Sequence, residues 1–180
     1  MRRILIGFAL ALIALPAWAQ SEAEMNWWKC SGDDPDFVIA GCSALIQSNL
    51  NSTSNHLVNT YANLLDEHYN RGNAYIQKGF YDEAIADFTQ VIVLKPDLAA
   101  PYNQRAWAYH LKGQDAKGLP DANRAIALAP NNGGTIETRA EIYEKLGQHD
   151  NAIADYRAAL KLNPNDKDSQ TGLKRLGATP

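Results

Sequence analysis

The residues best suited to chemistry are two cysteines and four histidines, and their spacing favours structure over catalysis. Cys30 and Cys42 are separated by eleven residues, which excludes a redox Cys-x-x-Cys motif, and two cysteines are too few for a four-cysteine zinc site. None of the histidines has the close spacing of metal ligands; they are His56, His68, His110 and His149. The sequence also lacks nucleophile, zinc-protease and phosphate-loop motifs. We therefore predict no catalytic residue, no metal, no cofactor and no enzymatic activity.

The start of the chain has the three-part layout of a secretory signal peptide. Two arginines follow Met1, residues 4–15 form an apolar run, and Pro16 is followed by small residues at Ala17 and Ala19. The alternative is a membrane anchor, but a run of about 12 residues is shorter than the ~20 that cross a bilayer. We predict a signal peptide over 1–19, a periplasmic or secreted mature protein, and no stable membrane insertion after cleavage.

Export would change the net charge of the mature chain and the oxidation state expected for its cysteines. Loss of residues 1–19 would leave 15 basic and 20 acidic residues, so the formal charge would move from −3 to −5. This balance argues against nucleic acid as a partner, because phosphate binding needs clustered Lys and Arg. In an oxidising compartment an even cysteine pair usually forms a bridge, and we predict a Cys30–Cys42 disulfide. Two free, buried thiols are the alternative.

A 34-residue period is the strongest pattern in the chain. Pro96, Pro130 and Pro164 follow it, and each comes two residues after a leucine. Three more series share the period: Tyr75, Tyr109 and Tyr143; Arg71, Arg105 and Arg139; Asp87, Asp121 and Asp155. With small residues such as Gly72, Ala84, Ala140 and Ala152 and the aromatic residues Phe88 and Tyr156, the pattern resembles the tetratricopeptide repeat, a helix–turn–helix unit.

This resemblance implies an all-α fold, a right-handed α–α superhelix of three full repeats at 65–98, 99–132 and 133–166. One unit cannot bury its apolar face alone, so the units must stack. Residues 24–48 align as a degenerate unit, which with a polar linker at 47–60 forms a region over 20–62. Residues 167–180 are predicted to cap the stack, with a helix from Ser169 to Leu176.

Two departures from the family pattern lead to further predictions. The family usually has leucine where this chain repeats arginine, and each arginine has an aspartate sixteen residues later. We predict a ladder of ion pairs; the alternative is that the arginines bind an anionic ligand. In the second unit, Gly118, Pro120 and Ala122 break the pattern. We predict that its second helix starts near Pro120, after a loose and flexible connection at Ala116–Leu119.

In the family, three positions of each first helix line the concave side of the stack, which forms an interaction groove. Here they hold Tyr69, Asn73 and Ile76, then Asn103, Trp107 and His110, then Glu137, Glu141 and Glu144. Trp107 is expected to be a partly exposed binding residue or to pack on a neighbouring helix. The glutamates form an acidic end of the groove, or a solvated face with Glu141 paired to Lys145. The family's clamp for C-terminal carboxylates is not supported, because Tyr69, Gly134 and Thr138 stand where it needs basic residues.

Three hypotheses for the function follow. The first is an exported scaffold that holds a protein or peptide segment in this groove, with an apolar residue near Trp107 and basic groups toward Glu137 and Glu141. The second is a structural accessory subunit of an envelope assembly, with contacts through edges or the convex face. The third is a thiol oxidoreductase or chaperone that uses Cys30 and Cys42.

Overall fold

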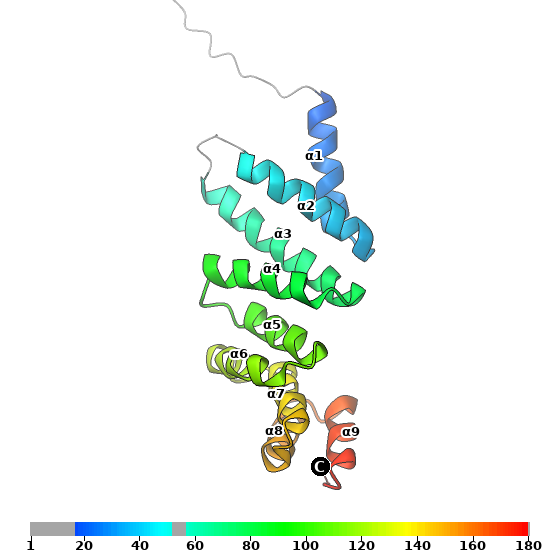
Figure 1. The fold of residues 1–180 in the computed structure, drawn as a ribbon, viewed down its shortest axis with the longest axis vertical. Helices are drawn as coiled ribbons and strands as arrows, with labels where there is room; N and C mark the ends of the chain where they lie inside the picture. Colours follow the sequence, from blue (N-terminus) through cyan, green and yellow to red (C-terminus); the bar gives the residue numbers. More distant parts are fainter. Residues whose placement is uncertain (1–16, 52–56, 180) are drawn as a thin grey trace, which may run out of the picture.

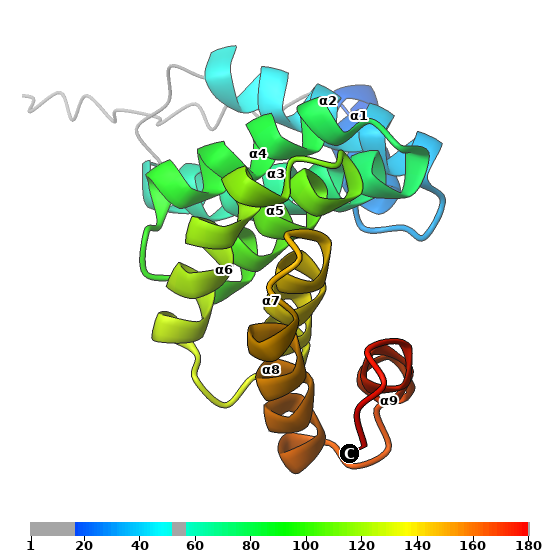
Figure 2. The same ribbon diagram turned by 60° about the horizontal axis from the view of Figure 1, so that its bottom comes forward.

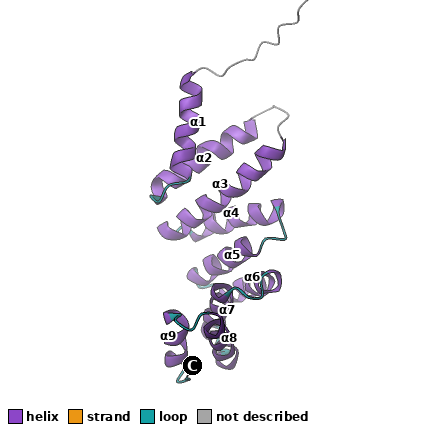
Figure 3. Cartoon of the chain, turned by 180° about the vertical axis from the view of Figure 1, so that it is seen from behind, coloured by secondary structure: helices purple, strands orange, loops and turns teal. Residues whose placement is uncertain are grey.

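The computed structural model describes residues 17–51 and 57–179, and this part of the chain contains helices and no strand (Figure 3). The helices are α1 (Ala17–Cys30), α2 (Pro35–Asn51), α3 (Leu57–Lys78), α4 (Tyr81–Leu94), α5 (Ala99–Leu111), α6 (Asp115–Leu128), α7 (Gly133–Lys145), α8 (His149–Leu162) and α9 (Lys167–Arg175). The all-α prediction is confirmed. Of the predicted signal peptide, residues 1–16 lie outside the described residues, and 17–19 form the first turn of α1.

The helices stack in chain order from α1 at one end to α9 at the other (Figure 1). Each packs against its neighbours in sequence, and the odd-numbered helices also contact one another in the series α1, α3, α5, α7, α9. Within the described residues, the even-numbered helices contact only odd-numbered ones. The odd-numbered helices therefore form one continuous inner layer and the even-numbered helices a separate outer one, which is the arrangement of a helical solenoid.

Glycine turns set the geometry of the full hairpins. Gly79, Gly113 and Gly147 have φ of 78°, 72° and 72°, a region that only glycine adopts freely. At each turn the carbonyl of the periodic tyrosine accepts a hydrogen bond from the N–H of the residue directly after the glycine, at 2.8–2.9 Å. This is the Schellman end of a helix. The same turn, at the same register, closes each first helix and sets where the second one begins.

The core is divided among the units, and each part is completed by the next one. Four buried clusters centre on Cys42, Phe88, Ala122 and Tyr156, which are all fully buried residues of second helices. Each cluster also contains one buried residue from the first helix of the following unit: Ala74, Ala108, Ile142 and Leu173 in turn. The last of these belongs to α9, which lies beside α7 and α8 (Figure 2). The predicted cap therefore closes the final cluster.

The predicted ion-pair ladder is present, and it lies within the units. The guanidinium groups of Arg71, Arg105 and Arg139 each donate two hydrogen bonds to the aspartate sixteen residues later, at 2.7–2.9 Å. Both partners are largely buried, with side-chain exposures of 17% for Arg71 and 5% for Asp87. Every arginine is therefore neutralised by its own aspartate, which argues against the alternative of an anionic ligand.

A third contact links each arginine to the preceding unit. The Nη1 atoms of Arg71, Arg105 and Arg139 each donate at 2.9 Å to an outer-layer side chain. The acceptors are Ser43 Oγ, Thr89 Oγ1 and Asn123 Oδ1, one from each preceding second helix. Each arginine thus joins its own hairpin to the one before it. The ladder holds the units together along the stack as well as within themselves.

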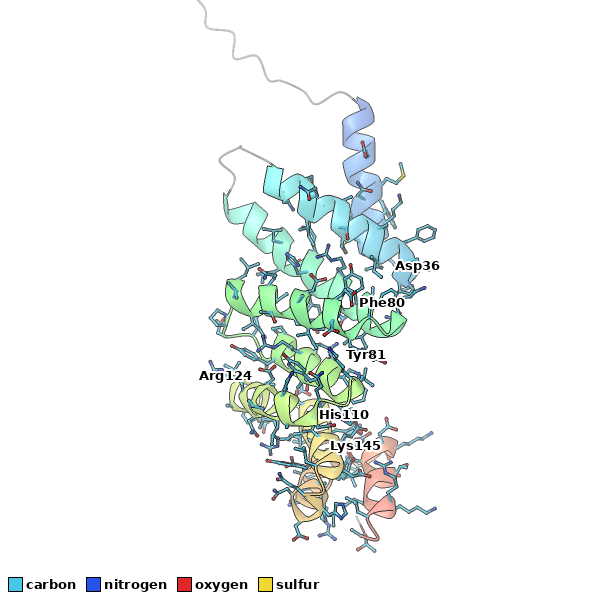
Figure 4. All side chains as sticks on the ribbon, in the orientation of Figure 1. Asp36, Phe80, Tyr81, His110, Arg124 and Lys145 are labelled. Atoms are coloured by element: carbon cyan, nitrogen blue, oxygen red, sulfur yellow. A yellow bond between two sulfur atoms is a disulfide. The ribbon has the colours of Figure 1, made fainter. Side chains whose placement is uncertain are left out.

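Salt bridges connect successive hairpins along the edge where α2 and α4 begin, which Asp36 and Tyr81 mark in Figure 4. Lys78 at the end of α3 contacts Asp36 at 2.9 Å, and Lys112 after α5 contacts Asp82. The two carboxylates are 70% and 72% exposed. Exposed ion pairs of this kind contribute little to stability, about 0–1 kcal/mol.

The prediction for the second unit is wrong. Helix α6 begins at Asp115, in register with α4 and α8, and Pro120 lies inside it. The turn at Gly113 fixes the start of this helix, because Gln114 N–H donates to Tyr109 O at 2.8 Å, as in the other two hairpins. The helix therefore includes Ala116–Leu119, despite the hydrogen bond that proline cannot make.

Gly118 occupies a point of close approach between α5 and α6. A Cβ atom there would lie 2.9 Å from the Ala106 carbonyl oxygen, closer than a carbon and a backbone oxygen pack. We expect Gly118→Ala to lower the free energy of unfolding by about 1–3 kcal/mol, as overpacked substitutions do. Gly133→Ala is the control, since its Cβ would meet nothing nearer than 3.8 Å. Urea denaturation measures both, and equal stability of the two variants would show that α5 and α6 are not so tightly packed.

The predicted linker is shorter than expected. Helix α2 continues to Asn51 and α3 already begins at Leu57, so most of 47–60 is helical, while 52–56 lie outside the described residues. The sequence from 57 to 65 has apolar residues at helical spacing, which the prediction of a polar linker did not take into account. The boundaries of the units themselves stay a prediction.

Candidate functional site

The inner layer formed by α1, α3, α5, α7 and α9 is the surface on which the sequence places a binding groove. Its residues toward the N-terminal end are mostly used in packing. Tyr69 stacks edge-on against Phe88, with ring centroids 5.7 Å apart, and Ile76 packs in the same cluster. Asn73 accepts a hydrogen bond from Gln104 Nε2 at 2.6 Å, which joins α3 to α5. Of the three residues predicted here, Tyr69 and Ile76 stabilise the fold.

The three residues of α5 that were predicted for the groove differ in their packing and hydrogen bonding. The Trp107 indole is partly buried and lies parallel to the His110 imidazole, with centroids 5.0 Å apart and planes at 23°. His110 Nδ1 lies 2.6 Å from Asp115 Oδ1, so the imidazole is held in place under the indole. Asn103 Oδ1 is buried and has no hydrogen-bond partner among the described residues. Trp107 thus stacks on its own helix and still contributes to an open cavity.

The glutamates of α7 divide into two kinds. Glu144 accepts hydrogen bonds from Arg175 at 2.7 Å and from the Tyr156 hydroxyl at 2.8 Å, which join α7 to α8 and α9. Its pKa is lowered, chiefly by the hydrogen bonds from Arg175. Within the described ranges, neither Glu137 nor Glu141 forms a salt bridge with an arginine or lysine. The salt-bridge contact of Glu141 is with His110 Nε2 at 3.9 Å, and the predicted pairing with Lys145 does not appear among the described residues.

A cavity of about 240 Å³ brings Trp107, Glu137 and Glu141 together between α5, α7 and α9. We call it the acidic pocket, and it is lined by Gln104, Trp107, Glu137, Thr138, Glu141 and Asp168. The sequence did not point to Gln104 or Asp168, and it named Thr138 only as a position where the family's clamp needs a basic residue. Extending the 34-residue period beyond residue 166 would have placed Asp168 at the start of a further first helix, next to Glu137 and Glu141.

Burial and like charges raise the pKa of the two glutamates in the acidic pocket. The pKa of Glu137 rises to about 7, first because the carboxyl is desolvated and then because Asp166, Glu141 and Asp168 surround it. The pKa of Glu141 is also raised, mainly by burial, although His110 and Arg175 oppose the rise. Glu137 is therefore partly protonated near neutral pH, which is unusual for a carboxyl group on a protein surface.

This pKa leads to a test of the pocket's electrostatics. A raised folded-state pKa gives a stabilising contribution that is present in acid and is lost as pH rises through about 7. We expect Glu137→Gln to raise the melting temperature at pH 8 and to change it little at pH 4.5. Glu83→Gln, at an exposed position of α4, is the control and should show no such pH dependence. Thermal denaturation across this range would refute the assignment if both variants followed the parent protein.

A second cavity, of about 400 Å³, lies between α1, α2 and α3. Its lining includes Trp27 and the carboxylates of Glu24, Asp66 and Glu67. Glu67 is only 6% exposed and accepts hydrogen bonds from Asn49 Nδ2 at 3.0 and 3.1 Å. Three carboxylates therefore line this cavity beside an apolar surface that includes Trp27 and Leu45.

Comparisons with known families agree with the period and the hairpins. Residues 68–113 match a family model described as TPR repeat, and residues 138–166 match one described as tetratricopeptide repeat. The chain contains tetratricopeptide repeats. No curated protein shows significant similarity to the chain. Within the described residues, no helix has the length and apolar character needed to cross a membrane.

Solved structures of tetratricopeptide domains resemble the chain closely in fold. The first such domain of Spaghetti (RPAP3), bound to the HSP90 peptide SRMEEVD, is 28% identical, with a TM-score of 0.60 over 61% of this chain and 87% of that one. The second domain of human RPAP3, in complex with the HSP70 peptide SGPTIEEVD, is 26% identical, with a TM-score of 0.59 over 62% and 93%. MamA from Desulfovibrio magneticus has a TM-score of 0.73 over 91% and 86% at 16% identity, which shows the fold alone.

Proposed function

We propose that this chain is an exported tetratricopeptide scaffold that binds a protein segment in the groove of its inner helix layer and carries out no catalysis. The observation that carries the proposal is the acidic pocket. It combines an accessible indole with the carboxylates of Glu137, Glu141 and Asp168, and none of these forms a salt bridge with a lysine or arginine of the described residues. A partly exposed tryptophan is a common binding hot spot. Two related domains were solved with peptides bound, which supports a protein or peptide as the class of partner.

The export part of the proposal rests on the sequence at 1–19. We expect the mature protein to begin at Gln20, because small residues stand at Ala17 and Ala19 after a short apolar run. Intact-mass measurement of the protein from the envelope fraction should show the loss of 19 residues. Full-length protein retained in the membrane would contradict export by cleavage and leave the groove proposal untouched.

A second candidate is a structural subunit that contacts its partner through the N-terminal edge. Exposed apolar side chains gather there, with exposures of 52% for Met25, 72% for Trp28 and 58% for Phe37, and they line one shallow cavity. Single exposed apolar residues are ordinary, but three together often mark an interface. The thiol hypothesis is less favoured, since Cys30 and Cys42 are 5% and 0% exposed and offer little access to a substrate.

Crosslinking followed by co-purification separates the two candidates. The groove variant is Trp107→Ala with Glu141→Lys, and the edge variant is Trp28→Ser with Phe37→Ser. We expect the groove variant to lose the partner that the parent protein retains, and the edge variant to keep it. If the edge variant alone loses the partner, the structural-subunit candidate replaces the proposal. Circular dichroism on both variants checks that each remains folded.

A further inference from the structure

Three carboxylates at the acidic pocket have no lysine or arginine partner among the described residues. Oxygen atoms of Glu137, Asp166 and Asp168 lie within 4.8 Å of one another. Among the described residues, no lysine or arginine forms a salt bridge with any of the three, in contrast to the aspartates of the arginine ladder. Like charges at this separation repel each other. In the described part of the chain, no lysine or arginine lines the pocket, so its negative charge would stabilise a positive group supplied by a ligand.

The hydrogen bonding of Glu137 also indicates that the pocket suits a positively charged donor. Its Oε1 atom is shielded from solvent and has no hydrogen-bond partner in the described part of the chain. A buried carboxylate oxygen without a donor is costly, and such groups in native proteins are normally satisfied. A ligand that brings a charged N–H donor into the pocket would satisfy it.

The pocket suits a basic side chain better than a metal ion. Asp166 is already engaged as the N-cap of α9, where it accepts hydrogen bonds from Asp168 N at 3.3 Å and from Ser169 Oγ at 2.6 Å. Calcium takes six to eight oxygen ligands, and the other two members of the cluster, Glu137 and Asp168, carry four carboxylate oxygens between them. The indole of Trp107 lines the pocket, and an aromatic face attracts a lysine or arginine head group rather than supplying a metal ligand.

We propose that the acidic pocket receives one arginine or lysine side chain of the bound protein segment, with its head group among Glu137, Glu141 and Asp168 and its stem against Trp107. This inference rests on the proposed function and names the chemistry of its ligand. The side chain that enters this pocket is thus opposite in charge to the glutamate and aspartate residues of the peptides SRMEEVD and SGPTIEEVD of the related domains. A glutamate-rich segment is repelled from this pocket.

The test uses the immobilised mature protein and two pools of heptapeptides with blocked ends and randomised flanks. One pool has a central arginine and the other has citrulline, which has nearly the same shape and no charge. We expect the arginine pool to be retained about tenfold more strongly than the citrulline pool. Citrulline lacks the positive charge, so it leaves the carboxylates of the pocket unpaired. Equal retention, or retention of neither pool, overturns the inference. Loss of arginine binding in millimolar calcium chloride, with calcium bound in the pocket, also overturns it in favour of a metal site.

Variants locate the effect. Glu137→Gln and Asp168→Asn should each remove most of the preference for arginine, whereas Glu83→Gln on the outer layer should keep it. Burial, and then the carboxylates of Asp166, Glu141 and Asp168, raise the pKa of Glu137 to about 7, and His110 faces Glu141. Retention should therefore rise several-fold from pH 6 to pH 8 in the parent protein and less in Glu137→Gln. A native partner that crosslinks to the groove without any charge preference would leave the proposed function standing and refute this inference alone.

Discussion

Asp87→Ala is expected to lower the free energy of unfolding by about 3–5 kcal/mol, because it leaves a largely buried arginine without its counter-ion. Two nitrogens of Arg71 donate to this carboxylate at 2.7 and 2.8 Å, and His68 Nδ1 lies 2.8 Å from it. Burial tends to raise the pKa of Asp87, but the hydrogen bonds from Arg71 and His68 outweigh it and lower the pKa. The contribution is thus present above about pH 4 and is lost in stronger acid.

Two further variants separate the charge pair from ordinary packing. Arg71→Leu with Asp87→Ala removes both charges and restores the residue type that tetratricopeptide repeats usually have, so it should recover most of the loss. Asp82→Ala breaks an exposed ion pair with Lys112 and should cost less than about 1 kcal/mol. Urea denaturation of the set gives the comparison. A double variant as unstable as Asp87→Ala would show that the ladder contributes through contacts other than the charge pair.

Cys42→Ser is expected to lower the stability of the N-terminal hairpin by about 3 kcal/mol and to leave the three full hairpins folded. The sulfur atoms of Cys30 and Cys42 are at bonding distance in the structure, and the sulfur pair closes a short loop between α1 and α2. Closure of a loop of about 13 residues stabilises by roughly this amount in the chain-entropy model. Hydrogen exchange should quicken in α1 and α2 and remain unchanged in α5 to α9.

A thiol count decides whether the bridge exists in the native protein. Because Cys42 is fully buried, the titration is done in denaturant on protein purified without reductant. We expect no free thiol, and reduction of the parent protein should reproduce the exchange pattern of Cys42→Ser. Two titratable thiols would instead favour the alternative of free, buried cysteines.

The sequence predicted the repeated part of this fold because the same contacts recur every 34 residues. The pairing of Arg71 with Asp87 recurs at the same offset in each unit, and the residue types are identical each time. The pairing could therefore be predicted from the sequence. The third contact of each arginine was missed, because Ser43, Thr89 and Asn123 share a position and a hydrogen-bonding role but differ in type. Identity between repeats therefore found the ion pairs and could not find the bonds between units.

The start of α6 was misjudged because a local signal was weighed against a periodic one. Proline usually stands in the first turn of a helix, which suggested a start near Pro120. The turn at Gly113 and the close approach of Gly118 to Ala106 hold the helix in the common register instead. Tertiary packing here overrides the preference of a single residue.

The candidate site was predicted in part. Trp107, Glu137 and Glu141 were identified from their positions on the first helices, and the structure places them around one cavity. Asp168 was missed, since it lies on the capping helix and outside the three full units. The groove was also predicted to include Tyr69, Ile76 and Glu144, but these side chains are already in contact with side chains of neighbouring helices. Helical position alone does not show which residues the next helix covers.

Site-specific photo-crosslinking tests most directly whether the inner layer is the binding surface. A photoreactive amino acid is placed at Gln104 in the acidic pocket, at Val93 on the outer layer, where the side chain is 69% exposed, and at Trp28 on the N-terminal edge. Each full-length variant is expressed in its own cells and irradiated. We predict an adduct between the chain and a partner protein from position 104 and none from position 93 or 28. Adducts from position 93 or 28 alone would contradict the groove as the site of binding.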